Sequence, residues 1–145
     1  MKLQTSIRNA LKIAERIKRC NGLIGTPYTS HEALRIKRAW LFGSTAKGKL
    51  NPGDTDILLE CYVVGWFNLE NAKLQPKSRN SMGHRYALCA MEEGRRYLRS
   101  GLKMVRFHDL HIDGNFGDIA KTKIMIYPKN NLTTDVFLTT SLKAA

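Results

Sequence analysis

Two carboxylates near the middle of the chain have the types and the spacing that chemistry could use. Asp54 and Asp56 stand two apart at the start of an apolar segment. Residues two apart on a strand project to one face, so both carboxylates would face the same way while Ile57 and Leu59 point into the core. Two carboxylates on one face repel each other unless a cation lies between them, and Mg²⁺ prefers carboxylate oxygens together with water and substrate phosphates. The pair is therefore a candidate site for Mg²⁺ or Mn²⁺.

A turn suited to phosphate is the second candidate feature. Gly43-Ser44 follows the apolar run Ala39 to Phe42, which is typical of a buried strand. Gly43 has no side chain to keep a phosphate from the backbone, and Ser44 supplies a hydroxyl and an amide donor, where a starting helix would also favour an anion. Lys47 and Lys49, in the loop that follows, could contact triphosphate oxygens. Gly43, Ser44 and Lys47 are therefore the expected nucleotide-binding residues.

The order of these features resembles the signature of the DNA polymerase β-like nucleotidyltransferase superfamily, and that of its small, minimal nucleotidyltransferase members most of all. That signature is an apolar strand, Gly-Ser, a spacer and Asp-x-Asp inside an apolar strand. Here its parts are Trp40 to Ser44, the nine-residue interval Thr45 to Gly53, and Asp54 to Leu59, about 20 of the 145 residues. Neither Gly-Ser nor Asp-x-Asp is specific alone; the specificity lies in their combination at this spacing.

The resemblance implies an enzyme that transfers a nucleoside monophosphate from an NTP, ATP included, to a hydroxyl acceptor on RNA, DNA, a protein or a small molecule. It assigns Asp54 and Asp56 as catalytic, metal-binding residues. Such enzymes usually take a third carboxylate from a later strand, and Asp109 is the expected one because it lies well inside the apolar pattern that begins at Val105. Asp113, which could be a turn residue instead, is the alternative.

Two other functions stay open if neither residue completes the site. The chain could keep the nucleotidyltransferase fold and bind nucleic acid without turnover. It could also be an antitoxin-like interaction module, which the resemblance to minimal nucleotidyltransferases implies as well.

The elements that must position these residues follow from hydrophobic periodicity and from helix and turn signals. We expect helices over residues 5–19, 29–37 and 81–99, the second beginning at a Thr29–Glu32 capping box. We expect strands over residues 39–42, 56–64, 103–113 and 121–127, with 136–138 as a further edge strand. This order predicts one α+β (mixed α/β) domain over residues 1–145, in which a sheet of about four to five strands packs against about three helices.

The composition concerns partners more than fold. Lys+Arg number 24 against 12 Asp+Glu, a net charge of +12, which favours polyanionic partners such as nucleic acid beside the NTP. So short a chain has little room for acceptor recognition, which a homodimer or a partner protein could supply. No segment approaches the roughly 20 apolar residues of a membrane span, so no membrane is expected. The three cysteines form no CxxC pair and no secretory signal is evident, so we expect a cytoplasmic protein with reduced thiols.

Overall fold

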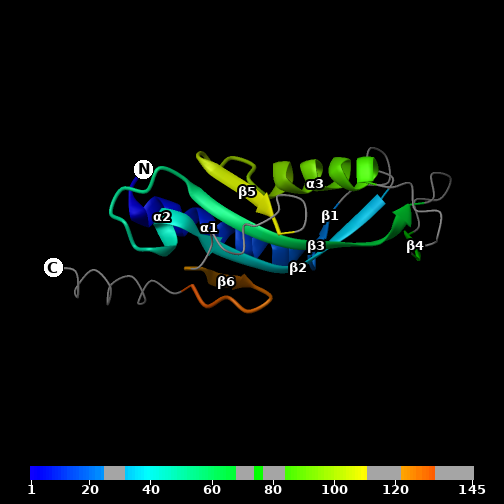
Figure 1. The fold of residues 1–145 in the computed structure, drawn as a ribbon, viewed down its shortest axis with the longest axis horizontal. Coiled ribbons are helices and arrows are strands. Elements are labelled where there is room, and N and C mark those ends of the chain that lie inside the picture. The colour runs from blue at the N-terminus through cyan, green and yellow to red at the C-terminus, as the bar shows by residue number, and fades with distance from the viewer. Residues whose placement is uncertain (25–31, 68–73, 77–83, 111–121, 133–145) are drawn as a thin grey trace.

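One curled sheet with helices against it makes up the fold in this computed structural model (Figure 1). The structure describes residues 1–24, 32–67, 74–76, 84–110 and 122–132. The elements in chain order are α1 (Leu3–Arg19), β1 (Leu23–Ile24), β2 (Glu32–Phe42), α2 (Gly43–Ala46), β3 (Thr55–Phe67), β4 (Leu74–Pro76), α3 (His84–Leu98), β5 (Val105–Asp109) and β6 (Ile124–Tyr127). The predicted α+β class is confirmed.

The sheet is built around the long hairpin of β2 and β3. Its strand order is β1-β2-β3-β4, with β5 added beside β3 and β6 beside β2. All pairings are antiparallel except that of β3 with β5. This sheet agrees with the expected one of about four to five strands, to which the two-residue strand β1 and the three-residue strand β4 add short pairings in the described part of the chain.

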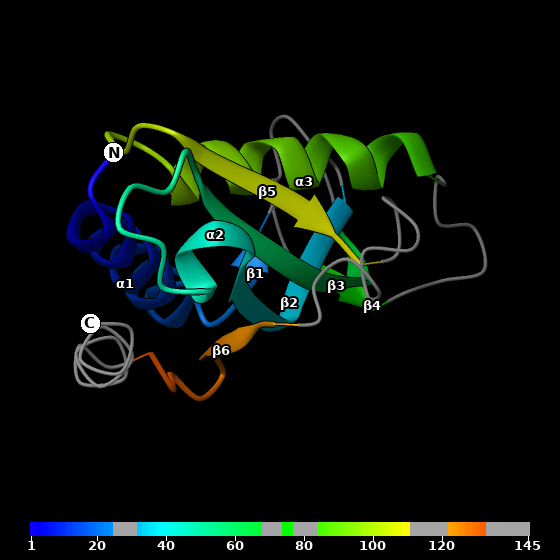
Figure 2. The same cartoon turned by 60° about the vertical axis from the view of Figure 1, so that its left-hand side comes forward.

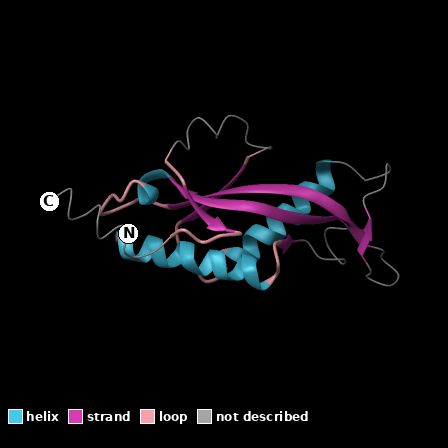
Figure 3. Ribbon diagram, turned by 90° about the horizontal axis from the view of Figure 1, so that it is seen from below, coloured by secondary structure: helices cyan, strands magenta, loops and turns pink. Residues whose placement is uncertain are grey.

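Helices α1 and α3 cover one face of this sheet, and α1 lies along it in Figure 3. The buried apolar residues of α1 recur every three or four positions, which places them on one side of the helix. Met91 and Leu98 of α3 belong to the same core cluster. That cluster also contains Ile57 and Leu59, so these two side chains, which follow the Asp-x-Asp residues, point into the core as expected. None of the helices in the described ranges is long and apolar enough to cross a membrane.

The predicted helix over residues 29–37 is wrong from Glu32 onward, because this stretch is the first half of β2. Leu34 and Ile36 are buried whereas Lys37 is exposed, an alternation that suits a strand with one covered face. Pairing with β3 along the whole strand outweighs the local capping signal. Thr29 lies outside the described residues.

The other expected elements agree with the structure to within a few residues. The first and third helices are α1 and α3, and the strands over 39–42 and 56–64 lie within β2 and β3. The strand expected over 103–113 is β5, described as far as Asp109, and that over 121–127 is β6. The expected edge strand 136–138 lies outside the described residues.

Candidate active site

The Asp-x-Asp carboxylates lie at one end of the sheet, on the face opposite the main core. Residues paired across neighbouring strands share a face, and Asp56 is paired with Phe42 of β2 and with Arg106 of β5. The next row on this face holds Leu58, Trp40 and His108. Leu58, Trp40 and Phe42 form a second, smaller buried cluster that supports the carboxylate end of the face.

Gly43 and Asp56 are in direct steric contact. Gly43 begins α2 with φ +73°, in the left-handed region that favours glycine. A Cβ atom on Gly43 would lie 2.5 Å from Oδ2 of Asp56. The missing side chain therefore makes room for a carboxylate, where the sequence had suggested room for a phosphate. Ser44 follows in the first turn of α2 and is half-buried, and Lys47 ends α2 with an exposed side chain.

The two carboxylates differ in their surroundings. Asp54 forms an ion pair with Arg106, with 3.3 Å between Oδ2 of Asp54 and Nε of Arg106. The pKa of Asp56 is raised, first by burial and then by the negative charge of Asp54, while His108 and Arg106 oppose the rise. The ionised pair is thus under electrostatic strain that an added cation would relieve.

A chain of buried hydroxyl groups holds the segment that carries the pair. Thr45 Oγ1 donates to the backbone carbonyl of Asp54 at 3.1 Å. Because the Thr45 hydroxyl proton is used in this bond, Thr45 Oγ1 accepts a hydrogen bond from the Ser6 hydroxyl of α1 at 2.6 Å. Ser6 in turn accepts a hydrogen bond from the Thr55 hydroxyl at 2.6 Å. All three hydroxyl side chains are fully buried. The resulting order Thr55, Ser6, Thr45, Asp54 ties α1, α2 and the start of β3 into one unit.

The register of β5 does not bring Asp109, the residue expected as the third carboxylate, together with Asp54 and Asp56. Asp109 is paired with Leu59, so it lies on the core face of the sheet, opposite to Asp56. It is 1% exposed and hydrogen-bonds the Cys61 thiol. Burial and the neighbouring Asp109 raise the pKa of that thiol, which keeps it protonated. Asp109 is a core polar residue in this arrangement.

The register puts Arg106 and His108 where the sequence had placed the third carboxylate. Both lie on the face of Asp56, and His108 meets the Phe42 ring edge-on at 5.4 Å between centroids. Neither residue was predicted from the sequence as a partner of the pair. A signal was present, because Val105 and Phe107 alternate with Arg106 and His108, which puts the two basic side chains together on the other face of β5. Asp113 lies outside the described residues.

Two carboxylates suit a magnesium or manganese ion that completes its shell with water and substrate phosphates. Within the described ranges, no group of three or more His, Cys, Asp or Glu side chains could hold a metal ion by itself. An ion held by Asp54 and Asp56 would therefore need further ligands, and Arg106 balances part of the charge of this pair.

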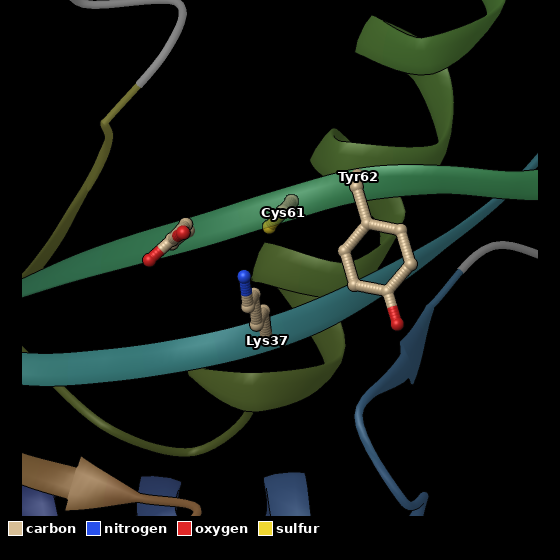
Figure 4. Close-up of a pocket in the computed structure, with 4 residues that line it drawn as sticks. Lys37, Cys61 and Tyr62 are labelled. Carbon is tan, nitrogen blue, oxygen red and sulfur yellow. The ribbon is translucent and has the colours of Figure 1, made fainter.

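A shallow hollow of about 500 Å³ lies farther along the same strands, lined by Lys37, Glu60, Cys61 and Tyr62 (Figure 4). Glu60 is held by Arg38 through two contacts, Nε to Oε2 at 2.8 Å and Nη2 to Oε1 at 3.1 Å. Its charge is thus balanced within the protein. Among the described residues that line this hollow, Glu60 is the only carboxylate.

Comparison of the chain with protein-family models, with curated proteins and with solved structures finds no match. Function must therefore be argued from the site itself.

Proposed function

We propose that this chain is a metal-dependent nucleotidyltransferase of the minimal, DNA polymerase β-like kind, which transfers a nucleoside monophosphate from an NTP to an acceptor hydroxyl. The observation that carries the proposal is the close approach of Gly43 and Asp56. It joins the two halves of the Gly-Ser and Asp-x-Asp signature in space, with a glycine required at the first half by the carboxylate of the second.

In this proposal Asp54 and Asp56 hold Mg²⁺ or Mn²⁺ together with the triphosphate of the NTP. The ion, when bound, stabilises the charge that develops on the attacking and leaving oxygens at the α-phosphate. Ser44, at the start of α2, and Lys47, at its end, offer donors to the phosphates. The Thr45 hydroxyl fixes the Asp54 backbone, so the carboxylates are oriented before substrate binds.

Deprotonation of the acceptor requires another group, because Asp109 faces the core. His108 is a candidate for this role, since it lies on the sheet face of Asp56 and its ring meets the Phe42 ring at 5.4 Å between centroids. Histidine is the side chain that most often acts as a general acid or base in enzymes. Arg106, now paired with Asp54, could turn to a phosphate once a cation replaces it, because its side chain is 68% exposed.

A nucleic-acid-binding protein that keeps this fold without turnover is the second candidate function. The ion pair between Arg106 and Asp54 favours it, since the arginine balances the charge of this carboxylate without a metal ion. An antitoxin-like module that binds a partner protein is the third, and it has no specific contact in its support.

Transfer of label from an NTP tests the proposal. The protein is incubated with α-³²P-labelled NTPs, Mg²⁺ or Mn²⁺, and mixed RNA, DNA and protein acceptors. We expect labelled product from the wild type and none from Asp54→Asn/Asp56→Asn, and a parallel reaction with γ-³²P-labelled NTP should release its label as pyrophosphate. Product that survives the double substitution contradicts the assignment. Binding of nucleic acid that is unchanged or tighter in the double variant, without any transfer by the wild type, supports the second candidate instead.

A further inference from the structure

The shallow hollow on β2 and β3 opens on the same face of the sheet as the carboxylate pair. The core cluster takes every second side chain of β3 from Ile57 to Cys61. The alternate side chains, from Asp56 to Tyr62, therefore project to the opposite face. Glu60 and Tyr62 line the hollow, so it shares a face with Asp56. Figure 4 shows the hollow with α3 behind the sheet.

A β-bulge in β2 adds a lysine to this face beside the hollow. Ile36 is paired with Cys61, whereas Arg38 is paired with Glu60, the residue just before Cys61. Lys37 is therefore an extra residue in β2, and an extra residue of this kind re-aims a side chain. The side chain of Lys37 is exposed and lines the hollow.

Lys123 is a second cation on this face, between the hollow and the carboxylate pair. Its Nζ lies 4.8 Å from the centroid of the Trp40 ring. Trp40 is paired with Leu58, in the row next to that of Asp56. Lys123 is exposed whereas Trp40 is buried, so the lysine covers the ring and presents its charge to solvent.

The two lysines carry charge that the described residues do not balance. Glu60, the carboxylate that lines the hollow, is neutralised by Arg38. Neither Lys37 nor Lys123 forms an ion pair with a carboxylate in the described part of the chain. Beyond the carboxylate pair, this face therefore offers positive charge, which matches the phosphates of a nucleic-acid strand.

Tyr62 supplies an aromatic ring at the hollow. It is 45% exposed, and its ring lies in front of β2 and β3 in Figure 4. Proteins that bind single strands combine cations with aromatic rings on which unpaired bases stack. The hollow of about 500 Å³ is within the range of sites for small organic ligands. Because it is shallow, a base held there can stay joined to a strand that continues on both sides.

The hollow lies a few nucleotides away from the carboxylate pair. Tyr62 stands six positions after Asp56 in β3, which is about 20 Å, or about six nucleotide steps of a stacked strand. Figures 1 and 2 show α2, where Gly43 contacts Asp56, at one end of the β2–β3 hairpin and β4 toward the other. The hollow lies between these two ends.

We infer that this face binds a single-stranded nucleic-acid acceptor. An unpaired base stacks on Tyr62 in the hollow, and phosphates bind Lys37 and Lys123. The terminal hydroxyl of the strand lies at Asp54 and Asp56. The inference rests on the proposed function and narrows its acceptor from any hydroxyl to the end of an RNA or DNA strand. Because stacking and phosphate contacts hold the strand, its affinity depends on salt more than on base sequence.

Anisotropy of a short fluorescein-labelled RNA strand, and of the same sequence in DNA, tests the inference on the full chain without NTP or metal. Lys37→Gln/Lys123→Gln removes two charges from this face, and Lys37→Arg/Lys123→Arg keeps them. Arg8→Gln/Lys12→Gln is the matched control, because it removes two exposed charges from α1, which covers the other face. Tyr62→Leu removes the ring and Tyr62→Phe keeps it. Circular dichroism checks that every variant is folded.

We expect Lys37→Gln/Lys123→Gln to bind about tenfold more weakly or worse. Its slope of log affinity against log salt should be smaller in magnitude by about 1.4, at about 0.7 for each phosphate that is no longer neutralised. The variant with two arginines should bind like the wild type, and the α1 control more tightly than Lys37→Gln/Lys123→Gln. Tyr62→Leu should bind about fivefold more weakly or worse with the wild-type slope, because stacking releases no ions. Tyr62→Phe should bind like the wild type.

Four results overturn the inference. The first is a wild type that binds no strand, and the second is equal weakening by both pairs of Gln substitutions, which shows only the effect of net charge. The third is equal weakening of strand and duplex binding by Tyr62→Leu, or of neither, because paired bases cannot enter the hollow. The fourth is a labelled mononucleotide that binds in place of the strand and is lost in Tyr62→Leu, which assigns the hollow to a small ligand.

The same measurements on Asp54→Asn/Asp56→Asn separate this inference from the proposed function. Strand binding in this variant that still depends on Lys37 and Lys123 supports the inference even where no transfer is detected. Transfer by the wild type to RNA and DNA that is unaffected by Lys37→Gln/Lys123→Gln and by Tyr62→Leu supports the proposed function and contradicts the inference.

Discussion

The Cβ position of Gly43 lies 2.5 Å from Oδ2 of Asp56, so a side chain at residue 43 would collide with this carboxylate. Gly101 has nearly the same backbone conformation, with φ +75° against +73°, but nothing lies within 4 Å of its Cβ position. A comparison of the two glycines therefore distinguishes the need for a positive φ, which both share, from the need for space beside Asp56, which only Gly43 has.

Gly43→Ala and Gly101→Ala should each lower the free energy of unfolding by about 1–2 kcal/mol, because alanine is strained at positive φ. Only Gly43→Ala should abolish nucleotidyl transfer, since Asp56 must turn away from the new methyl group. Urea unfolding gives the first quantity and transfer of α-³²P label the second. Full transfer activity in Gly43→Ala would mean that the position of Asp56 in this structure is not required for the reaction.

The raised pKa of Asp56 predicts a pH dependence of stability. A folded-state pKa above the unfolded value of about 3.9 means that the folded protein binds more protons than the unfolded chain between the two values. Stability is therefore lost as pH rises through this interval and does not return at higher pH. Asp56→Asn should be more stable than the wild type at neutral pH, and this advantage should shrink as pH falls toward about 4.

Urea unfolding at a series of pH values measures this difference, with the exposed Glu92→Gln as the control. The control should follow the wild-type profile apart from a constant offset. An Asp56→Asn variant that is less stable than the wild type at neutral pH contradicts the predicted cost of burying the ionised carboxylate beside Asp54.

The buried hydroxyl chain should affect both stability and site geometry. Thr45→Val keeps the shape of the side chain but leaves Ser6 and the Asp54 carbonyl short of a partner, at a cost of about 1–3 kcal/mol. Mn²⁺ affinity should fall with it, because Asp54 loses its backbone anchor. Thr45→Ser keeps the hydroxyl and should retain wild-type Mn²⁺ affinity even if it is less stable. Equal Mn²⁺ affinity in all three proteins would restrict the hydroxyl chain to a role in folding.

The placement of Asp109 leads to an opposite expectation. Asp109→Asn changes a buried partner of Cys61 and should alter the free energy of unfolding by about 1–3 kcal/mol, while Mn²⁺ affinity stays as in the wild type. Calorimetric titration of Mn²⁺ at a temperature where both proteins are folded compares them. Loss of Mn²⁺ binding in Asp109→Asn would restore it as the third carboxylate.

Local patterns in the sequence predicted much of the fold. The spacing of apolar residues placed α1 and α3, and the run after Asp56 placed β3. The first half of β2 was missed because the Thr29–Glu32 capping signal is local, whereas the strand owes its existence to pairing with β3 over its whole length.

In the candidate site, too, local relations could be predicted from the sequence and long-range relations could not. Asp54 and Asp56 were predicted as a pair from the two-residue period of a strand, and Gly43 was predicted from the spacing of Gly-Ser and Asp-x-Asp along a short segment. Arg106 and His108 were not, because their relation to Asp56 depends on the register of a parallel strand about 50 residues away. The hydroxyl chain through Ser6 was also out of reach, since no sequence pattern joins a helix serine to two threonines that lie 39 and 49 residues on.

Binding of Mn²⁺ to the carboxylate pair tests the central claim most directly, because it does not depend on knowing the acceptor. Electron paramagnetic resonance of free Mn²⁺ is followed as wild type, Asp56→Asn or Asp54→Asn/Asp56→Asn is added, with and without a non-hydrolysable NTP analogue. We expect the wild type to bind Mn²⁺ and the analogue to tighten this binding. Asp56→Asn should bind at least about tenfold more weakly, a difference of about 1.4 kcal/mol, and the double variant should bind no ion at this site. A double variant that binds Mn²⁺ and the analogue as tightly as the wild type would contradict the proposed metal site.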